Sequence, residues 1–288
     1  MERFYCIAGI HIRVLIPDEL MYRNDGVLSV FVTEEKEWDY SLKLESAEPL
    51  LLPEGRMIFQ DYDKRVYRCG EREIRYMGAV ESSLEEAYLR IERRERDCNI
   101  QVQLNKIGYV VNSRLVADAL EAEHMITEHH GFILHASYIA WNGRAILFTA
   151  PSGTGKSTQA ELWRTYRGAE LINGDRAAVR VQPEGIIAHG IPFSGSSGVG
   201  KNKSFPLGAI VYLSQAPYTA ITRLSGVRAF RNVWEGCSIN IWNRKDIELG
   251  TQTVAQVISS VPVYHLACTP DETAVTILET ALRHDERI

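Results

Sequence analysis

The segment that most constrains this chain runs from Ala150 to Thr158 and is rich in glycine, serine and threonine. It follows the apolar run 144–149 and precedes a stretch with helical character, which is the strand–loop–helix setting of a phosphate-binding loop. Small residues let successive backbone N–H groups curl around an anion, and a lysine adds a positive charge. The sequence therefore predicts a nucleoside triphosphate site on an α/β fold.

Individual residues of this loop have separate expected roles. We expect Lys156 to contact the outer phosphates and the hydroxyl of Ser157 to bind Mg²⁺. Ala150 departs from the motif, because a glycine is usual at that position. A glycine- and serine-rich turn with a surface lysine is the alternative interpretation. The residues predicted to bind the nucleotide here are Ser152, Gly153, Thr154, Gly155, Lys156, Ser157 and Thr158.

Composition excludes few classes of protein. The chain has 288 residues, of which 45% are hydrophobic and 24% charged, which is ordinary globular usage. Its net charge of -5, without a sustained basic stretch, argues against a nucleic-acid partner. No apolar run reaches membrane-spanning length, and the five scattered cysteines form no C-x-x-C pair. We expect a cytoplasmic protein with reduced thiols and no membrane partner, and leave a homo-oligomer open.

The hydrophobic pattern changes near residue 110. Before it, apolar residues alternate with polar ones over 87–92 and 98–104, which predicts a β-hairpin around 93–97. We therefore expect a sheet-rich N-terminal domain over 1–110 and a second domain over 111–288, which begins with a linking helix over 113–130. Shorter apolar runs predict further strands at 5–10, 12–16, 27–32 and 40–44.

In the second domain, strands and helices are expected in a mixed order. Strand 132–141 should turn at Asn142-Gly143 into strand 144–149, so an antiparallel pair precedes the loop. This differs from the alternating parallel pattern of most phosphate-loop folds. The later expected elements are a helix 157–166, a strand 170–173, a hairpin 177–187, strands 209–213 and 263–267, and helices 222–242, 253–261 and 271–282.

Asp175 is the predicted acidic partner of the loop. A phosphate-loop enzyme needs a carboxylate on or near Mg²⁺, and Asp175 follows the strand 170–173. The strand 209–213 ends without an acidic residue, so we assign the metal to Ser157 and Asp175. The alternative is that Asp175 belongs to a turn with exposed charges.

These motifs resemble the HPr kinase/phosphorylase family, whose core is shared with phosphoenolpyruvate carboxykinase. The resemblance covers about residues 128–280 and is closest to the small members encoded beside peptide-modifying enzymes. The family has a histidine on the strand before the loop and a carboxylate pair after it. Here His135 matches the histidine and Asp175 the second carboxylate, whereas the first falls on Gly174.

The resemblance implies a mixed-sheet kinase domain and an ATP- and Mg²⁺-dependent activity. The γ-phosphoryl group would go to a serine-type hydroxyl, with Asp175, Lys156 and His135 as catalytic residues. We expect a peptide or small protein as acceptor, because a sheet-rich front domain offers edges with which an extended peptide can pair. The alternatives are a nucleotide-binding regulatory module without transfer activity, favoured by Ala150 and Gly174, and a kinase of free serine or a small carboxylate.

A second loop, 193–204, is also rich in glycine and serine and carries two lysines. We interpret it as a lid or acceptor-binding loop, in which Lys201 and Lys203 close over phosphate during transfer. An ordinary solvated loop is the alternative interpretation.

Overall fold

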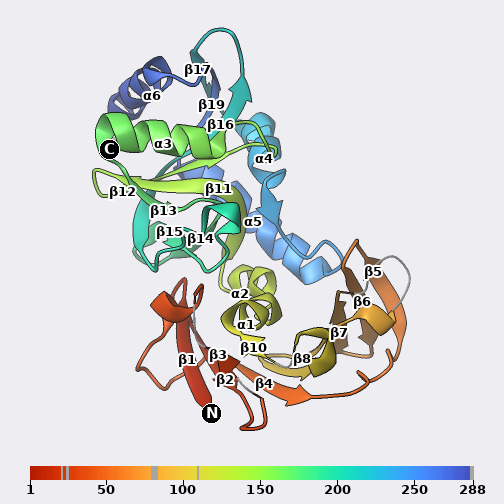
Figure 1. The fold of residues 1–288 in the computed structure, drawn as a ribbon. Helices are drawn as coiled ribbons and strands as arrows, with labels where there is room; N and C mark the ends of the chain where they lie inside the picture. Colours follow the sequence, from red (N-terminus) through yellow and green to blue (C-terminus); the bar gives the residue numbers. More distant parts are fainter. Residues whose placement is uncertain (21, 24–25, 79–83, 109, 286–288) are drawn as a thin grey trace. The chain divides into compact units, whose positions relative to one another are not determined.

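The structure is a computed structural model that describes residues 1–20, 22–23, 26–78, 84–108 and 110–285 (Figure 1). The chain has a mixed α/β fold and divides into two compact units, residues 1–121 and 122–288. Among the residues described, no helix combines the length and the apolar character needed to cross a membrane.

The N-terminal unit contains an eight-stranded mixed sheet in the order β1-β2-β4-β9-β8-β7-β6-β5, in which β4 pairs in parallel with β2 and β9. A short parallel pair of β10 with β3 stands apart from it. Its strands are β1 (Glu2–Ile7), β2 (Ile10–Leu15), β3 (Tyr22–Arg23), β4 (Tyr40–Ser46), β5 (Arg56–Gln60), β6 (Lys64–Cys69), β7 (Arg72–Met77), β8 (Leu89–Arg94), β9 (Asp97–Val102) and β10 (Val111–Asn112).

The predicted hairpin is confirmed as the antiparallel pair β8 and β9. The predicted strand over 27–32 is wrong, because a 3₁₀ helix at Ser29–Phe31 occupies this segment. Leu28 and Phe31, three residues apart, are both fully buried, and a 3₁₀ turn aligns such positions. The sequence patterns gave no sign of β5, β6 and β7, whose inward positions include charged residues such as Arg65 and Glu73.

The predicted linking helix is two helices, α1 (Ser113–Ala119) and α2 (Ala122–Glu128). Glu121 lies between them with a positive φ of 50°, which no α-helix includes. Its buried carboxylate pairs with Arg75 at 2.8 Å and with Arg93 at 2.9 Å. Helical periodicity does not reveal these long-range ion pairs, and the chain divides into its units after Glu121 instead of near residue 110.

The C-terminal unit is built on a nine-stranded mixed sheet, in which β11 and β16 each pair with several neighbours along their length. Its strands are β11 (Gly131–Trp141), β12 (Arg144–Thr149), β13 (Glu170–Asn173), β14 (Arg176–Gln182), β15 (Gly185–Gly190), β16 (Ser204–Gln215), β17 (Ala220–Leu224), β18 (Cys237–Ser238) and β19 (Val263–Cys268). Its further helices are α3 (Lys156–Arg167), α4 (Gly226–Trp234), α5 (Arg244–Ser260) and α6 (Glu272–His284).

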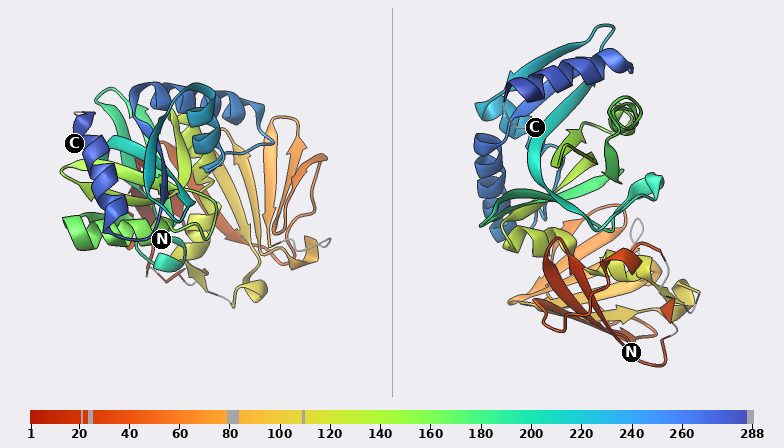
Figure 2. Two further views of the ribbon diagram at one scale, coloured as in Figure 1. Left: turned by 90° about the horizontal axis from the view of Figure 1, so that it is seen from above. Right: turned by 90° about the vertical axis from the view of Figure 1, so that its left-hand side faces the viewer.

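Helices cover both faces of this sheet, as Figure 2 shows. On one face, Trp163 of α3 and Leu278 of α6 pack with Ile146 and Phe148 of β12. On the other, residues of α4 and α5 pack with Leu147 and its neighbours. Successive residues of β12 therefore enter different cores, which explains why its sequence is a continuous apolar run.

The predicted helix over 222–242 is wrong at both ends, because α4 ends at Trp234 and residues 237–238 form β18. Residues 220–224 form β17, which pairs antiparallel with β19, and α4 begins only at Gly226. The pairing with a strand more than forty residues away in the sequence overrides the local helical pattern at this position.

Strand directions bring several chain turns to one edge of the C-terminal sheet. β12 runs parallel to β16, and β16 runs parallel to β19. β13 shares the direction of β12, because both are antiparallel to β11. The carboxyl ends of these four strands therefore face the same side, which is where ligands bind in open α/β sheets.

Candidate functional site

The loop between β12 and α3 has the backbone that its glycines permit. Gly153 has a φ of 78° and Gly155 a φ of 113°, values that side-chain-bearing residues seldom adopt. Ala150 does not have a positive φ, and it is buried in the same apolar cluster as Trp163. The alanine in place of the first glycine is thus compatible with this loop and adds packing.

Lys156 begins α3 and folds back over the loop. Its Nζ donates to the carbonyl oxygens of Ala150 at 2.9 Å and Pro151 at 3.3 Å, and the residue is only 8% exposed. Burial lowers the pKa of Lys156, and the nearby Asp175 carboxylate opposes this shift. The loop carbonyls therefore hold a cation that an incoming phosphate could take over.

Asp175 is positioned by the turn that ends β13. The side-chain oxygen of the fully buried Asn173 accepts hydrogen bonds from the backbone N–H groups of Asp175 at 2.9 Å and Arg176 at 3.0 Å. The Asn173 amide in turn donates to the carbonyl of Ile191 at 2.8 Å. This turn is rigid, so the direction of the Asp175 side chain is set by buried groups.

His135 lies on β11 and faces Asp175. Its Nε2 is 3.2 Å from Oδ1 of Asp175, and its carbonyl accepts a hydrogen bond from Thr149 at 3.0 Å. Burial lowers the pKa of His135, as does the charge of Lys156, whereas Asp175 opposes both effects. The lowered pKa favours the neutral imidazole, the form that accepts a proton.

These side chains line one cavity of about 480 Å³, which we call the lysine cavity. Its lining joins residues of the loop and α3 with residues from β11, from the end of β13 and from the loop after β15. They are His135, Ser152, Gly153, Gly155, Lys156, Ser157, Thr158, Gly174, Asp175 and Ser197. All three residues predicted as catalytic and both predicted metal ligands are among them.

Ser197 explains why position 174 is a glycine. A Cβ atom on Gly174 would lie 2.2 Å from Oγ of Ser197, so any side chain there would collide with it. Similarly, a Cβ on Gly195 would lie 2.7 Å from Cγ of Asp175. The segment 194–198 thus fills the space that a first acidic residue would occupy.

Lys201 and Lys203 are placed away from the lysine cavity. Both pair with the carboxylate of Glu170, at 2.7 Å and 2.8 Å from Oε1, and neither is among the described residues that line the cavity. The backbone N–H of Lys201 donates to Ile172 at 3.0 Å, so this part of the loop is attached to β13. The sequence did not indicate this pairing, because Glu170 is about thirty residues away.

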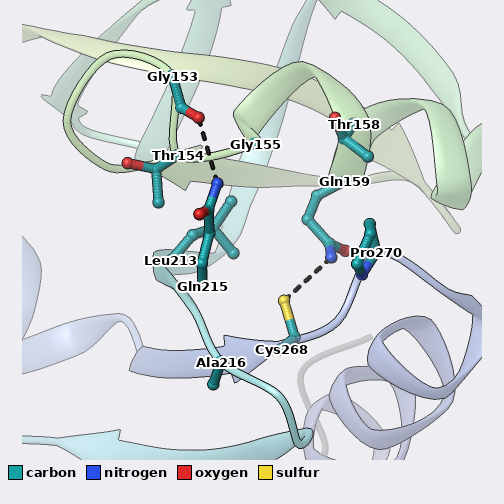
Figure 3. A pocket seen from close by; sticks show the side chains of 10 residues that line it. All are labelled: Gly153, Thr154, Gly155, Thr158, Gln159, Leu213, Gln215, Ala216, Cys268 and Pro270. Atoms are coloured by element: carbon teal, nitrogen blue, oxygen red, sulfur yellow. Dashed lines mark hydrogen bonds between the residues drawn. The ribbon is translucent and has the colours of Figure 1, made fainter.

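A second cavity, of about 450 Å³, lies against the loop at the ends of β16 and β19, and we call it the glutamine cavity (Figure 3). Gln215 donates to the carbonyl of Gly153 at 3.4 Å, and Gln159 donates to Sγ of Cys268 at 3.2 Å. Thr154 also lines this cavity instead of the lysine cavity. Sequence reasoning missed these glutamines, although Gln215 lies two residues after the predicted strand over 209–213.

A third cavity, of about 260 Å³, shares His135 with the lysine cavity, and we call it the tyrosine cavity. Tyr212, Asn232 and Glu235 line it with polar groups, beside the loop residues Ala150 and Pro151. His135 therefore lines both the lysine cavity and the tyrosine cavity.

The oxygen donors of the lysine cavity fit Mg²⁺. The carboxylate of Asp175 and the hydroxyl of Ser157 are hard ligands, and Mg²⁺ is usually bound by one or two carboxylates together with waters and substrate phosphates. The described residues contain no group of three His, Cys, Asp or Glu side chains that could hold an ion. This donor set can therefore bind a metal ion to which substrate phosphate oxygens supply further ligands.

Comparison with known proteins assigns the family. The family model described as SynChlorMet cassette protein ScmC matches residues 98–273, which is more than half of the chain. The chain therefore belongs to the ScmC family.

No curated protein matches the chain. Among solved structures, the Hpr(Ser) kinase/phosphatase from Coxiella burnetii is similar over 54% of this chain and 90% of that chain, with 13% identity and a TM-score of 0.32. At that TM-score the similarity establishes neither a shared fold nor a shared activity.

Proposed function

We propose that the chain is an ATP- and Mg²⁺-dependent kinase that transfers the γ-phosphoryl group to a serine-type hydroxyl on a peptide or small protein. One observation carries the proposal: the lysine cavity combines a glycine-rich loop, a buried lysine, a carboxylate and a histidine. Phosphoryl transfer needs positive charge at the phosphates and a group that accepts the hydroxyl proton, and this cavity has both.

The nucleotide would lie across the loop. Its phosphates occupy the lysine cavity, where Lys156 leaves the loop carbonyls to contact them. The nucleoside occupies the glutamine cavity, whose wall includes Leu213 and Pro270 as apolar surfaces and Gln215 as an amide partner for a base. Mg²⁺, held by Ser157 and Asp175, would neutralise charge on the phosphates.

In this proposal, Asp175 and His135 act on the acceptor hydroxyl. Their side chains are 3.2 Å apart, so a proton taken from the acceptor hydroxyl can be shared between them. The tyrosine cavity opens at His135 and has room for an acceptor side chain, which Asn232 and Glu235 could orient.

Two observations support a peptide over a free metabolite. In the N-terminal unit, β5 pairs with β6 alone among the strands described, so its other edge is available to an extended chain. Met57 on this strand is 46% exposed. An edge strand with an exposed apolar side chain is suited to peptide pairing.

The test is transfer from radiolabelled ATP to a pool of serine-containing peptides and, in parallel, to free serine. We expect label in peptides that depends on Mg²⁺ and is lost in K156A. Label in free serine alone would favour the small-molecule kinase. ATP binding without transfer to either acceptor would favour the regulatory module, which the lack of a side chain at Gly174 supports.

A further inference from the structure

Ser197 stands out among the hydroxyl-bearing residues of the lysine cavity. Four of the described lining residues carry an alcohol hydroxyl, and three of these, Ser152, Ser157 and Thr158, belong to the phosphate loop and α3. Ser197 comes from a different segment, the short 3₁₀ helix Gly195–Ser197. It joins Gly174 and Asp175 in the lining of the same cavity.

These hydroxyls differ in the side from which each could approach the transferred phosphoryl group. In phosphoryl transfer the attacking and leaving oxygens are roughly in line, so the acceptor must come from the side opposite the leaving diphosphate. Ser152, Ser157 and Thr158 belong to the loop and helix that would hold the diphosphate in the proposed kinase. Ser197 shares its part of the lining with Asp175, which is where an acceptor hydroxyl is needed.

The backbone keeps Ser197 beside the carboxylate. Its Oγ lies 2.2 Å from the position of a Cβ on Gly174, and Gly195 approaches Asp175 almost as closely. The backbone N–H of Gly174 donates to the carbonyl of Val199 at 3.3 Å, which ties the segment to the Asp175 turn. Ser197 is exposed; its hydroxyl donates to the carbonyl of Ser194 at 2.6 Å and accepts from the backbone N–H of Val199 at 3.2 Å, and rotation about one torsion would release both bonds.

We propose that Ser197 is a phosphorylation site that the chain modifies itself, within its own lysine cavity; this rests on the proposed kinase function. The Ser197 oxygen forms a bond to the γ-phosphorus of ATP as the bond from that phosphorus to the bridging oxygen breaks. The hydroxyl proton passes to the Asp175 carboxylate, and ADP leaves. The product is a phosphoserine at position 197.

The experiment incubates the full chain with ATP and Mg²⁺ without an acceptor and measures the intact mass, then locates the label by peptide mass spectrometry. We expect one phosphoryl group, at Ser197, and none in S197A. S259A is the matched control, because the Ser259 hydroxyl, at an exposed position of α5, also donates to a carbonyl three residues earlier; it should be labelled like the unaltered chain. S197T keeps a hydroxyl and should carry label at position 197.

Two further measurements make the outcome decisive. Label on K156A when it is mixed with the unaltered chain would overturn modification within one chain, as would a labelled fraction that rises with protein concentration. The peptide pool described above is tested in parallel. A chain that labels peptides but never Ser197 overturns this inference and leaves the kinase proposal intact, whereas a chain that binds ATP and labels neither overturns both.

Discussion

The two walls of the lysine cavity are built in different ways. The wall formed by residues 150–158 is one continuous segment, shaped by the positive φ angles of Gly153 and Gly155. The opposite wall comes from three segments that contribute His135, Asp175 and Ser197. The first wall depends on local backbone geometry, and the second on the pairing of β11 with β13 and β14. A change in one wall should therefore affect nucleotide contacts, and a change in the other the transfer step.

The largest expected effect is that of Lys156→Ala. Loss of the cation should reduce transfer by about a thousandfold, the scale seen when a charge-stabilising group is removed from a phosphoryl or acyl transfer site. The melting temperature should change little, since the Lys156 ammonium donates its hydrogen bonds to carbonyls of its own loop. Steady-state transfer and thermal unfolding check both parts. K245A, at an exposed lysine with one ion pair, is the control. Full transfer by folded K156A would contradict the loop assignment.

Asp175→Asn should reduce transfer by about a hundredfold, less than Lys156→Ala does. The amide keeps the size of the side chain but loses the charge that binds metal and accepts a proton. The Mg²⁺ concentration for half-maximal rate should rise. Mg²⁺ titrations of the transfer rate measure this. D118N is the matched control, since Asp118 is a similarly part-exposed carboxylate paired with an arginine. An unchanged Mg²⁺ dependence in D175N would move the metal elsewhere.

His135→Gln should reduce transfer by about tenfold, as expected for loss of one positioned proton acceptor beside a remaining carboxylate. The pKa of His135 is lowered, so the neutral base persists below the ordinary histidine value of about 6.5. The acidic limb of the kcat/KM profile should therefore have its midpoint below about pH 6.5, with kcat/KM increasing as the pH rises through it. This limb should be absent in H135Q. A limb that H135Q retains would assign it to another group.

Glu170→Gln should have the smallest effect. Glu170 pairs with Lys201 and Lys203 at part-exposed positions, where ion pairs are worth about 1 kcal/mol or less. Transfer should stay within about twofold, since the pairs lie outside the cavity lining. Unfolding and transfer assays measure both quantities. A marked gain in transfer would show that the freed lysines act on phosphate, as the sequence predicted.

The stability of this pairing should also depend on pH. The two lysines lower the pKa of the Glu170 carboxyl, so the contribution of the pairs is present above the unfolded pKa and is lost as pH falls through the lowered value. The difference in stability between the unaltered chain and E170Q should therefore shrink in acid. Denaturant unfolding at several pH values measures it, and a difference that grows toward low pH would contradict the pairing.

The sequence by itself determined the elements whose signals are local. The turn at Asn142-Gly143, the glycine-containing turn between β12 and α3, and the strand before Asp175 were predicted at their observed positions, because glycine conformation and hydrophobic period act within a few residues. Where a distant contact competes with the local pattern, the prediction from the sequence was wrong. The break at Glu121, the strand β17 and the pairing of Lys201 with Glu170 are each held by residues remote in the chain.

Only the tertiary structure decided how the second wall of the cavity is assembled. The sequence named His135 and Asp175 separately, but their 3.2 Å approach follows from the antiparallel pairing of β11 with β14, in which His135 is opposite Arg176, and no local pattern encodes this register. It likewise left Gly174 as an unexplained departure, whereas the structure fills that space with Ser197. Backbone conformation depends on neighbours along the chain, and side-chain proximity depends on which strands pair. The strand, glycine turn and helix over 144–167 could therefore be predicted from the sequence, and the arrangement of the opposite wall could not.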